Sequence, residues 1–149
     1  MRFRLDRSFV FEHAPAVVWD ALSRPQDYPR WWTWLRRIDI DGDGLTEGTT
    51  AHCYVRAPIP FALRVTLHVE RVDAGRRVEV RIAGDLEGSG SLELADDTDG
   101  TCARLTWAVQ PAPRLLRAAG WLARPALHWG QEWAVSTGAK QFRHRGLPN

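Results

Sequence analysis

The 149-residue sequence contains little cysteine, very little lysine and no long apolar run. Its two cysteines, Cys53 and Cys102, lie in segments that read as strands, and their spacing fits neither a disulfide framework nor a metal site. The first residues, MRFRLDRSFVFEH, lack the apolar core of a signal peptide, and no stretch approaches the roughly 18 apolar residues of a membrane span. We therefore expect a reduced, cytoplasmic protein with no bound metal and no stable membrane insertion.

Neither charge nor motifs indicate a nucleic-acid, nucleotide or hydrolase function. The 20 basic residues, almost all arginine, are scattered among 18 acidic ones, and a net charge of +2 is too balanced to predict nucleic-acid binding. No Ser-His-Asp arrangement, nucleophile elbow, phosphate-binding glycine loop or dinucleotide fingerprint is visible. We expect one domain, residues 1–149, with no nucleic-acid partner and no cofactor.

Alternating apolar and polar residues predict an antiparallel sheet. Residues 2–12 carry phenylalanine or leucine at alternate positions. From residue 37 to residue 110 strand patterns follow one another without an intervening helix, which excludes the strand–helix alternation of a doubly wound sheet. The later predicted strands are Arg37–Asp41, Gly48–Arg56, Phe61–Val72, Arg77–Leu86, Gly90–Leu94 and Thr101–Gln110, with turns at DGDG, APIP, DAGR, EGSG and DDTDG.

Two short helical segments follow the first strand. APAVVWDALS begins after His13 and ends before Pro25, and PQDYPRWWTWL is broken by Pro29. The second segment is the most aromatic stretch of a chain with eight tryptophans. It could form a lid on the core or the mouth of a cavity.

A basic amphipathic segment, PRLLRAAGWLAR at residues 113–124, precedes the last helix. It could dock its apolar side on the sheet or contact a membrane. Its short length favours the first interpretation.

The stretch Pro125–Phe142 reads as the last long helix, because proline suits a first helical turn and glycine and proline follow the end. One side is polar and is flanked by Trp129 and Trp133. A helix that only fills a core would carry Leu and Ile on its other side. Either a space faces this helix or large side chains from the sheet fill it. The residues on that side are Gly130, Ala134, Thr137, Gly138 and Gln141.

Three stretches carry a family resemblance: VWDALSRPQDYPRWW at 18–32, GDLEGSGSLEL at 84–94 and RPALHWGQEWAVSTGAKQF at 124–142. They resemble segments of the polyketide cyclase/dehydrase and lipid-transport family, within the START-related (SRPBCC) helix-grip superfamily. The resemblance implies an α+β fold in which a seven-stranded antiparallel sheet grips the C-terminal helix around an elongated apolar cavity. One departure is Gln131, where related sequences often carry histidine.

Strand parity and helical phase suggest which residues would line such a cavity. Aromatic residues would form walls, and amides and hydroxyls would orient a ligand. The ligand-binding candidates are Tyr28, Trp32, Tyr54, Trp107, Leu127, Gln131, Ala134, Val135, Gly138 and Gln141.

Residues suited to proton transfer are few. Asp85 and Glu87 share one strand parity, but the apolar residues around them have the other, so both carboxylates face solvent unless a bulge shifts the register. His52 and Tyr54 share a strand face, and either they or their apolar neighbours line the cavity.

Three functions are compatible with the sequence. The leading hypothesis is binding of a small or medium hydrophobic molecule, lipid-like or aromatic. The alternative is an aromatic polyketide cyclase or dehydratase that uses His52, Tyr54, Asp85 or Glu87 for proton transfer. A third is an interaction protein that dimerises through the two tryptophans on the last helix, so the chain is expected to be a monomer or a homodimer. A cavity without carboxylate or histidine would favour simple binding.

Overall fold

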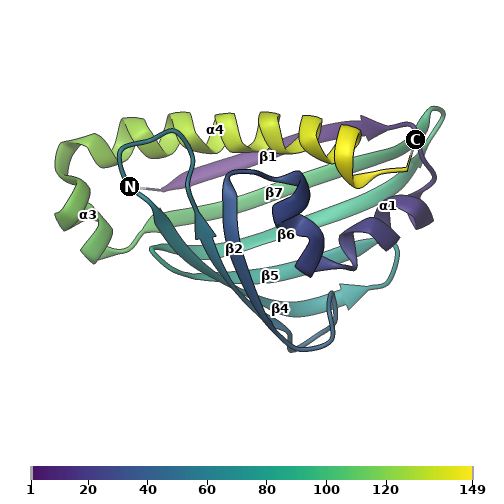
Figure 1. Ribbon diagram of the computed structural model, residues 1–149, viewed down its shortest axis with the longest axis horizontal. Coiled ribbons are helices and arrows are strands. Elements are labelled where there is room, and N and C mark those ends of the chain that lie inside the picture. The colour runs from purple at the N-terminus through teal and green to yellow at the C-terminus, as the bar shows by residue number, and fades with distance from the viewer. Residues whose placement is uncertain (1, 149) are drawn as a thin grey trace.

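The computed structural model describes residues 2–148 and has the expected α+β architecture, a seven-stranded antiparallel sheet with one long helix along a face (Figure 1). The strands are β1 (Phe3–Phe11), β2 (Leu35–Asp41), β3 (Thr50–Val55), β4 (Leu63–Asp73), β5 (Arg77–Gly84), β6 (Leu86–Asp97) and β7 (Gly100–Pro111). The helical segments are α1 (Pro15–Leu22), η1 (Pro25–Asp27), α2 (Tyr28–Trp31), α3 (Pro113–Ala119), η2 (Gly120–Leu122), α4 (Ala123–Gln141) and η3 (Phe142–Gly146).

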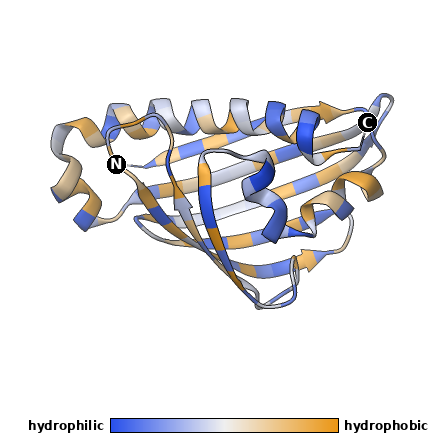
Figure 2. Cartoon of the chain, in the orientation of Figure 1, coloured by the Kyte–Doolittle hydropathy of each residue, from blue (hydrophilic) through white to orange (hydrophobic). Residues whose placement is uncertain are grey.

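Strands β2 to β7 form a meander, and β1 joins the sheet beside β7. The β1–β7 register is continuous from Phe3 opposite Val109 to Phe11 opposite Thr101. A continuous register keeps each strand's apolar parity on one face, and Figure 2 shows the resulting alternation of hydrophobic and hydrophilic residues along the strands. The apolar face is called the inner face here, because α4 covers it.

Helix α4 runs along β1 and β7 on the inner face (Figure 1). It begins at Ala123, so Pro125 lies in its first turn as predicted, and the π-helical turn η3 follows it. Leu127, Gly130 and Val135 are buried on the side that faces the sheet. Among the residues described, no helix is long and apolar enough to cross a membrane.

The hydrophobic core consists of three clusters. At the C-terminal end of α4, Trp31 and Phe142 pack with residues of α1, and Val18 there is fully buried. At its N-terminal end, Leu115 of α3 and Leu127 of α4 pack against the sheet. The third cluster is formed on β2 and β3 by Leu35, Ala51 and Cys53.

The prediction for β6 was wrong, because EGSG is not a hairpin turn. Strand β6 begins at Leu86 and passes through Gly88 and Gly90, and the chain reverses at Gly84 and Asp85 instead. A β-carbon on Gly88 would lie 2.0 Å from the carbonyl oxygen of Ala108 on β7. The glycines therefore allow neighbouring strands to approach closely. Sequence alone does not distinguish this role of glycine from its role in a turn.

Candidate ligand-binding site

Inner-face side chains in the middle of the sheet remain partly exposed although α4 covers that face. On β7, Ala103 and Val109 are buried at 4% and 6% exposure, whereas Leu105 and Trp107 between them are half-buried. The same contrast recurs on β4 and β5. Their half-buried inner residues are Val65, Leu67, Val80 and Ile82. Val65, Ile82 and Trp107 pack against the core at the N-terminal end of α4, and Leu67 packs against the cluster on β2 and β3. This less closely covered part of the inner face, beneath the middle of α4, is called the hollow below.

Two glycines on α4 lie towards the two ends of this region, where neighbouring segments approach the helix closely. A β-carbon on Gly130 would lie 3.3 Å from Ile59 of the β3–β4 loop, and one on Gly138 would lie 3.5 Å from both Trp32 and Trp34. The glycines are eight residues apart, which is roughly 12 Å along a helix. The β3–β4 loop and the aromatic segment therefore fill the space beside the two glycines. Ala134 lies between the glycines on the helix and is half-buried.

The aromatic segment after α1 forms one wall. Trp32 donates a hydrogen bond from Nε1 to the Gly138 carbonyl at 2.9 Å, and its ring stacks on Trp34 with centroids 5.5 Å apart. The buried Trp31 packs against Phe142 at 5.1 Å between centroids. Stacked indoles and a hydrogen bond to the helix backbone hold this wall against the C-terminal half of α4.

Gln131 and Trp107 bridge α4 and the sheet. Trp107 Nε1 donates to Gln131 Oε1 at 3.0 Å, which orients the amide so that its Nε2 group retains its two donor hydrogens. No partner for that nitrogen is found among residues 2–148. Gln131, which also lines a groove beside the start of α4, therefore presents a neutral donor at this position.

Two polar atoms near Gly138 have no partner within the described chain. They are Trp34 Nε1, a donor, and Gln141 Oε1, an acceptor, and both are shielded from solvent. Gln141 uses its other amide atom, Nε2, to donate to Thr33 Oγ1 at 3.0 Å. A buried polar atom without a partner is costly, so these two atoms mark the least satisfied part of the packing around the C-terminal half of α4.

Tyr28 and Cys53 contribute packing rather than acid–base chemistry. The Tyr28 hydroxyl donates to the Leu22 carbonyl, and burial raises the pKa of this phenol. Burial also raises the pKa of the Cys53 thiol to about 11. Both groups stay protonated near neutral pH because desolvation disfavours their charged forms. The candidates Leu127 and Val135 are buried core residues of α4.

His52, Tyr54 and Glu87 lie on the outer face of the sheet and not beside the hollow. His52 pairs with Thr66 across the strands, with Nδ1 and Oγ1 3.1 Å apart. Tyr54 lies opposite Arg64, whose guanidinium carbon is 5.9 Å from the ring centroid. Their apolar neighbours face inward instead, because the β2–β3–β4 register buries Cys53. The assignment of Tyr54 to the cavity is thereby corrected.

Asp85 has a structural position at the β5–β6 turn. Its carboxylate accepts a hydrogen bond from the Arg64 backbone N–H at 2.8 Å and from Arg114 Nε at 3.0 Å. These bonds tie β4 to the start of α3. Asp85 therefore does not point into the hollow. Glu87, which is exposed opposite Gln110, does not point into it either.

One charged pair at the rim of the hollow was not anticipated from the sequence. Arg7 follows the inner parity of β1 and forms a 2.5 Å ion pair with Glu132 of α4. A sequence feature could have identified Arg7, because it interrupts the run of apolar residues at alternate positions from Phe3 to Phe11. Both side chains are about two-fifths exposed, so the pair closes the β1 edge rather than lying in the hollow.

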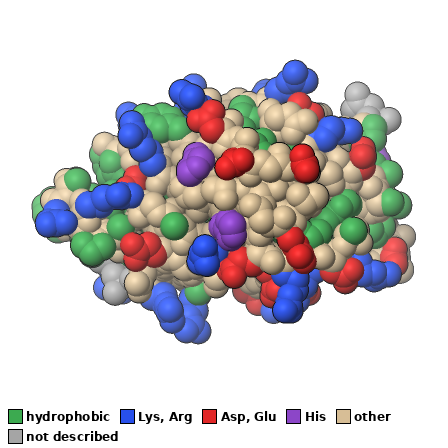
Figure 3. All heavy atoms as spheres, turned by 90° about the horizontal axis from the view of Figure 1, so that it is seen from below, with side chains coloured by type: hydrophobic (Ala, Val, Ile, Leu, Met, Phe, Trp, Pro, Cys, Tyr) green, Lys and Arg blue, Asp and Glu red, His purple; other side chains and the backbone are tan. Residues whose placement is uncertain are grey.

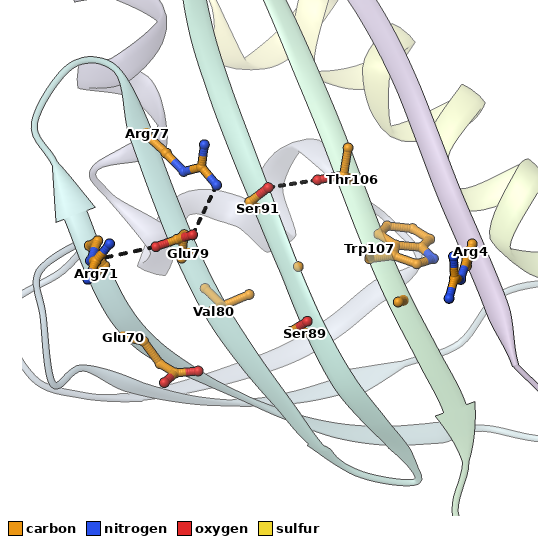
Figure 4. Close-up of a pocket in the computed structure, with 12 residues that line it drawn as sticks. Arg4, Glu70, Arg71, Arg77, Glu79, Val80, Ser89, Ser91, Thr106 and Trp107 are labelled. Carbon is orange, nitrogen blue, oxygen red and sulfur yellow. Dashed lines mark hydrogen bonds and ion pairs between the residues drawn. The ribbon is translucent and has the colours of Figure 1, made fainter.

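The outer face carries a separate shallow groove of about 610 Å³ across β5, β6 and β7 (Figure 4). Its floor is built from small side chains, and Ser91 and Thr106 hydrogen-bond to each other at 2.7 Å. Arg77 and Glu79 at its side form an ion pair at 2.9 Å. The polar groups of this groove largely satisfy one another, and Figure 3 shows acidic, basic and histidine side chains interspersed over the lower surface.

The antiparallel sheet, the long C-terminal helix and the hollow between them define a helix-grip protein. The chain belongs to the polyketide cyclase/dehydrase and lipid transport family, whose profile matches residues 2–145. This confirms the resemblance seen in the three sequence stretches. No curated protein sequence matches the chain.

Solved structures with the same fold include enzymes and plant proteins. The aromatase/cyclase ZhuI from Streptomyces sp. R1128 has a TM-score of 0.75 and 15% identity, covering 98% of this chain and 94% of its own. The ginseng major latex-like protein 151 from Panax ginseng has a TM-score of 0.73 and 9% identity, covering 99% of both chains. The di-domain aromatase/cyclase StfQ of the steffimycin pathway has a TM-score of 0.73 and 10% identity, covering 96% of this chain and 50% of its own. At these identities the likeness concerns the fold alone.

Proposed function

We propose that the protein binds a small or medium-sized hydrophobic molecule, lipid-like or aromatic, in the hollow between the sheet and α4. The observation that carries this proposal is the partial exposure of inner-face apolar residues in mid-sheet, between two fully packed ends of the same face. Apolar walls with a few convergent polar groups are typical of ligand sites.

The polar groups around the hollow favour a ligand with at least one oxygen. Gln131 offers N–H donors beside Trp107. A ligand oxygen can accept from them, which a pure hydrocarbon cannot do. We therefore expect hydroxylated or carbonyl-bearing hydrophobic molecules to bind more tightly than hydrocarbons of the same size.

The cyclase alternative has less support. His52, Tyr54 and Glu87 lie on the outer face of the sheet, and Asp85 lies at the β5–β6 turn. One histidine, His128, lines the groove that Gln131 also lines. General acid–base catalysis needs its proton donor or acceptor within hydrogen-bond reach of the substrate. Binding without turnover is therefore the function we favour.

The test is to fill the hollow from α4. Under this proposal Ala134→Phe places a ring in the hollow and should lower affinity for an uncharged hydrophobic fluorescent probe such as N-phenyl-1-naphthylamine about tenfold or more. The matched control is Lys140→Phe, which adds the same ring at an exposed position on the helix. Native mass spectrometry of both variants and the parent then shows whether a molecule retained from the expressing cells is lost only from Ala134→Phe.

Circular dichroism shows whether each variant is folded. Undiminished probe binding by a folded Ala134→Phe variant would refute the site, because the added ring and the ligand cannot occupy one space. Loss of binding in both variants would point to an unspecific effect of an added aromatic residue and would equally count against the site.

A further inference from the structure

We propose that the end of the molecule formed by α3, η2 and the first two turns of α4 docks on an anionic lipid bilayer. The contact consists of exposed apolar side chains that enter the interface and a basic groove that receives phosphate headgroups. This surface, called the basic tip below, comprises Trp121, Leu122, Trp129, Arg117 and the groove residues Arg2, Arg4, Arg124 and His128.

The exposed apolar residues of the protein gather at the basic tip. Trp121 is 85% exposed, Leu122 40% and Trp129 50%, and Val10 is the other large exposed apolar side chain described. Gly120, with a φ of 59°, reverses the chain between α3 and η2, in a conformation that glycine adopts readily. This turn projects Trp121 into solvent at the end of the molecule. Tryptophan is the side chain that membrane interfaces favour, because its ring is apolar and its N–H remains wet.

Positive charge surrounds these apolar residues. Residues 113–131 contain three arginines and one histidine and no acidic residue. Arg114 pairs with Asp85, but Arg117 and Arg124 form no ion pair with any carboxylate in the described part of the chain. Figure 3 shows hydrophobic and basic side chains together at this left-hand end. Basic side chains beside interfacial tryptophans are drawn to the negative potential of anionic membranes.

A groove of about 640 Å³ lies beside the start of α4. It is lined by Arg2, Phe3 and Arg4 of the N-terminal segment and by Arg124, Pro125, His128 and Gln131 of α4. No acidic residue lines it, and none of its three arginines is paired with a described carboxylate. Guanidinium groups bind phosphate oxygens through parallel hydrogen bonds, so the groove suits the headgroup of an anionic phospholipid.

The basic tip adjoins the proposed ligand site. Ile59 of the β3–β4 loop contacts Gly130 at the nearer limit of the hollow, one residue beyond Trp129. Docking would therefore bring this edge of the hollow close to the bilayer. The groove shares Gln131 with the proposed ligand site, but the docking inference rests on the exposed apolar residues and the arginines and does not require the hollow to bind a ligand.

Vesicle co-sedimentation of the full chain tests the inference. We expect binding to vesicles of phosphatidylcholine and phosphatidylglycerol, much weaker binding to phosphatidylcholine alone, and release in high salt, which screens the charges. Trp121→Ser with Leu122→Ser should lower the partition coefficient about tenfold, and so should Arg117→Gln with Arg124→Gln. The control variants Val10→Ser and Arg36→Gln change exposed residues outside the basic tip. They should leave the partition coefficient unchanged.

Other results would overturn the proposal. Equal binding to both vesicle types, no binding to either, or equal effects of the control variants would each exclude this surface as an anionic-membrane contact. The protein could instead fail to bind vesicles and form a concentration-dependent dimer that Trp121→Ser abolishes. That result would assign the basic tip to contact with a second copy of the chain. Probe binding by Ala134→Phe is measured separately without vesicles, so failure of docking and failure of the ligand site are distinguishable.

Discussion

At the scale of single residues, the packing of α4 is decided by what approaches its glycines. The indole rings of Trp32 and Trp34 lie over Gly138, and Trp32 donates to the backbone carbonyl of the same residue. A larger side chain would hold the aromatic wall away from the helix and break that bond. The glycine therefore fixes the position of the wall that borders the hollow.

Two substitutions at Gly138 should have opposite effects. Gly138→Ala adds a β-carbon at an ordinary contact distance of 3.5 Å from the indoles and should stabilise the protein by about 0.5–1 kcal/mol through helix propensity. Gly138→Leu would force the rings apart and should destabilise it by about 1–3 kcal/mol. Urea unfolding measures both values, and a neutral Gly138→Leu would show that the indoles do not pack on this residue.

At the scale of elements, β6 depends on glycine for its pairing with β7. A β-carbon on Gly88 would clash with backbone atoms of β7, which cannot change rotamer as a flexible side chain can. The φ of 157° adds strain. Gly88→Ala should therefore destabilise the protein by about 2–4 kcal/mol. Gly90→Ala is the matched control, because its nearest contact is 3.3 Å away, and it should cost clearly less. Thermal unfolding followed by circular dichroism compares the two, and equal costs would contradict the strand geometry.

The elements themselves could be predicted from periodicity, but the faces of several strands could not. Alternation identified β1, β4 and β5, and the proline and glycine signals bracketed α4, because these patterns are local. Which face of β3 points inward depends on pairing with β2 and β4, which buries Cys53 and exposes His52. Such a choice is made by long-range register, and a one-residue slip reverses it.

The part of the proposed site that lies on one element could be derived from the sequence. Helical phase assigned Gln131 and Ala134 to the covered side of α4, and both are half-buried. The contact of Ile59 with Gly130 was not predictable, because the β3–β4 loop has no periodic pattern to orient it. The Trp107–Gln131 bond likewise depends on how the helix crosses the sheet.

At the scale of the whole molecule, the buried thiol and phenol should make the free energy of unfolding depend on pH in the alkaline range. The Cys53 pKa rises from 9.0 to about 11 on burial, and burial raises the Tyr28 pKa as well. As pH rises through 9, the unfolded chain loses the thiol proton first, so the free energy of unfolding should fall between pH 9 and 11. The thiol contributes a slope of about 1.4 kcal/mol per pH unit there.

Denaturant titrations across that pH range measure the slope. Cys53→Ala removes the group and should flatten the decline relative to the parent, and Cys102→Ala is the control for removing a thiol elsewhere. An unchanged slope in Cys53→Ala would show that Cys53 does not titrate abnormally. Below pH 9 the parent should keep its full stability from this group, since the thiol is protonated in both states.

The stacked indoles of Trp32 and Trp34 also give the molecule an optical property. Their ring planes are inclined by 21° with centroids 5.5 Å apart, and Trp129 and Trp133 form a second stacked pair on the far side of α4 at 6.5 Å. Chromophores held this closely interact electronically, so we expect each pair to contribute to the ultraviolet dichroism spectrum. One pair borders the hollow, and Trp129 of the other pair belongs to the basic tip, so the unlabelled chain carries an intrinsic chromophore pair at each surface.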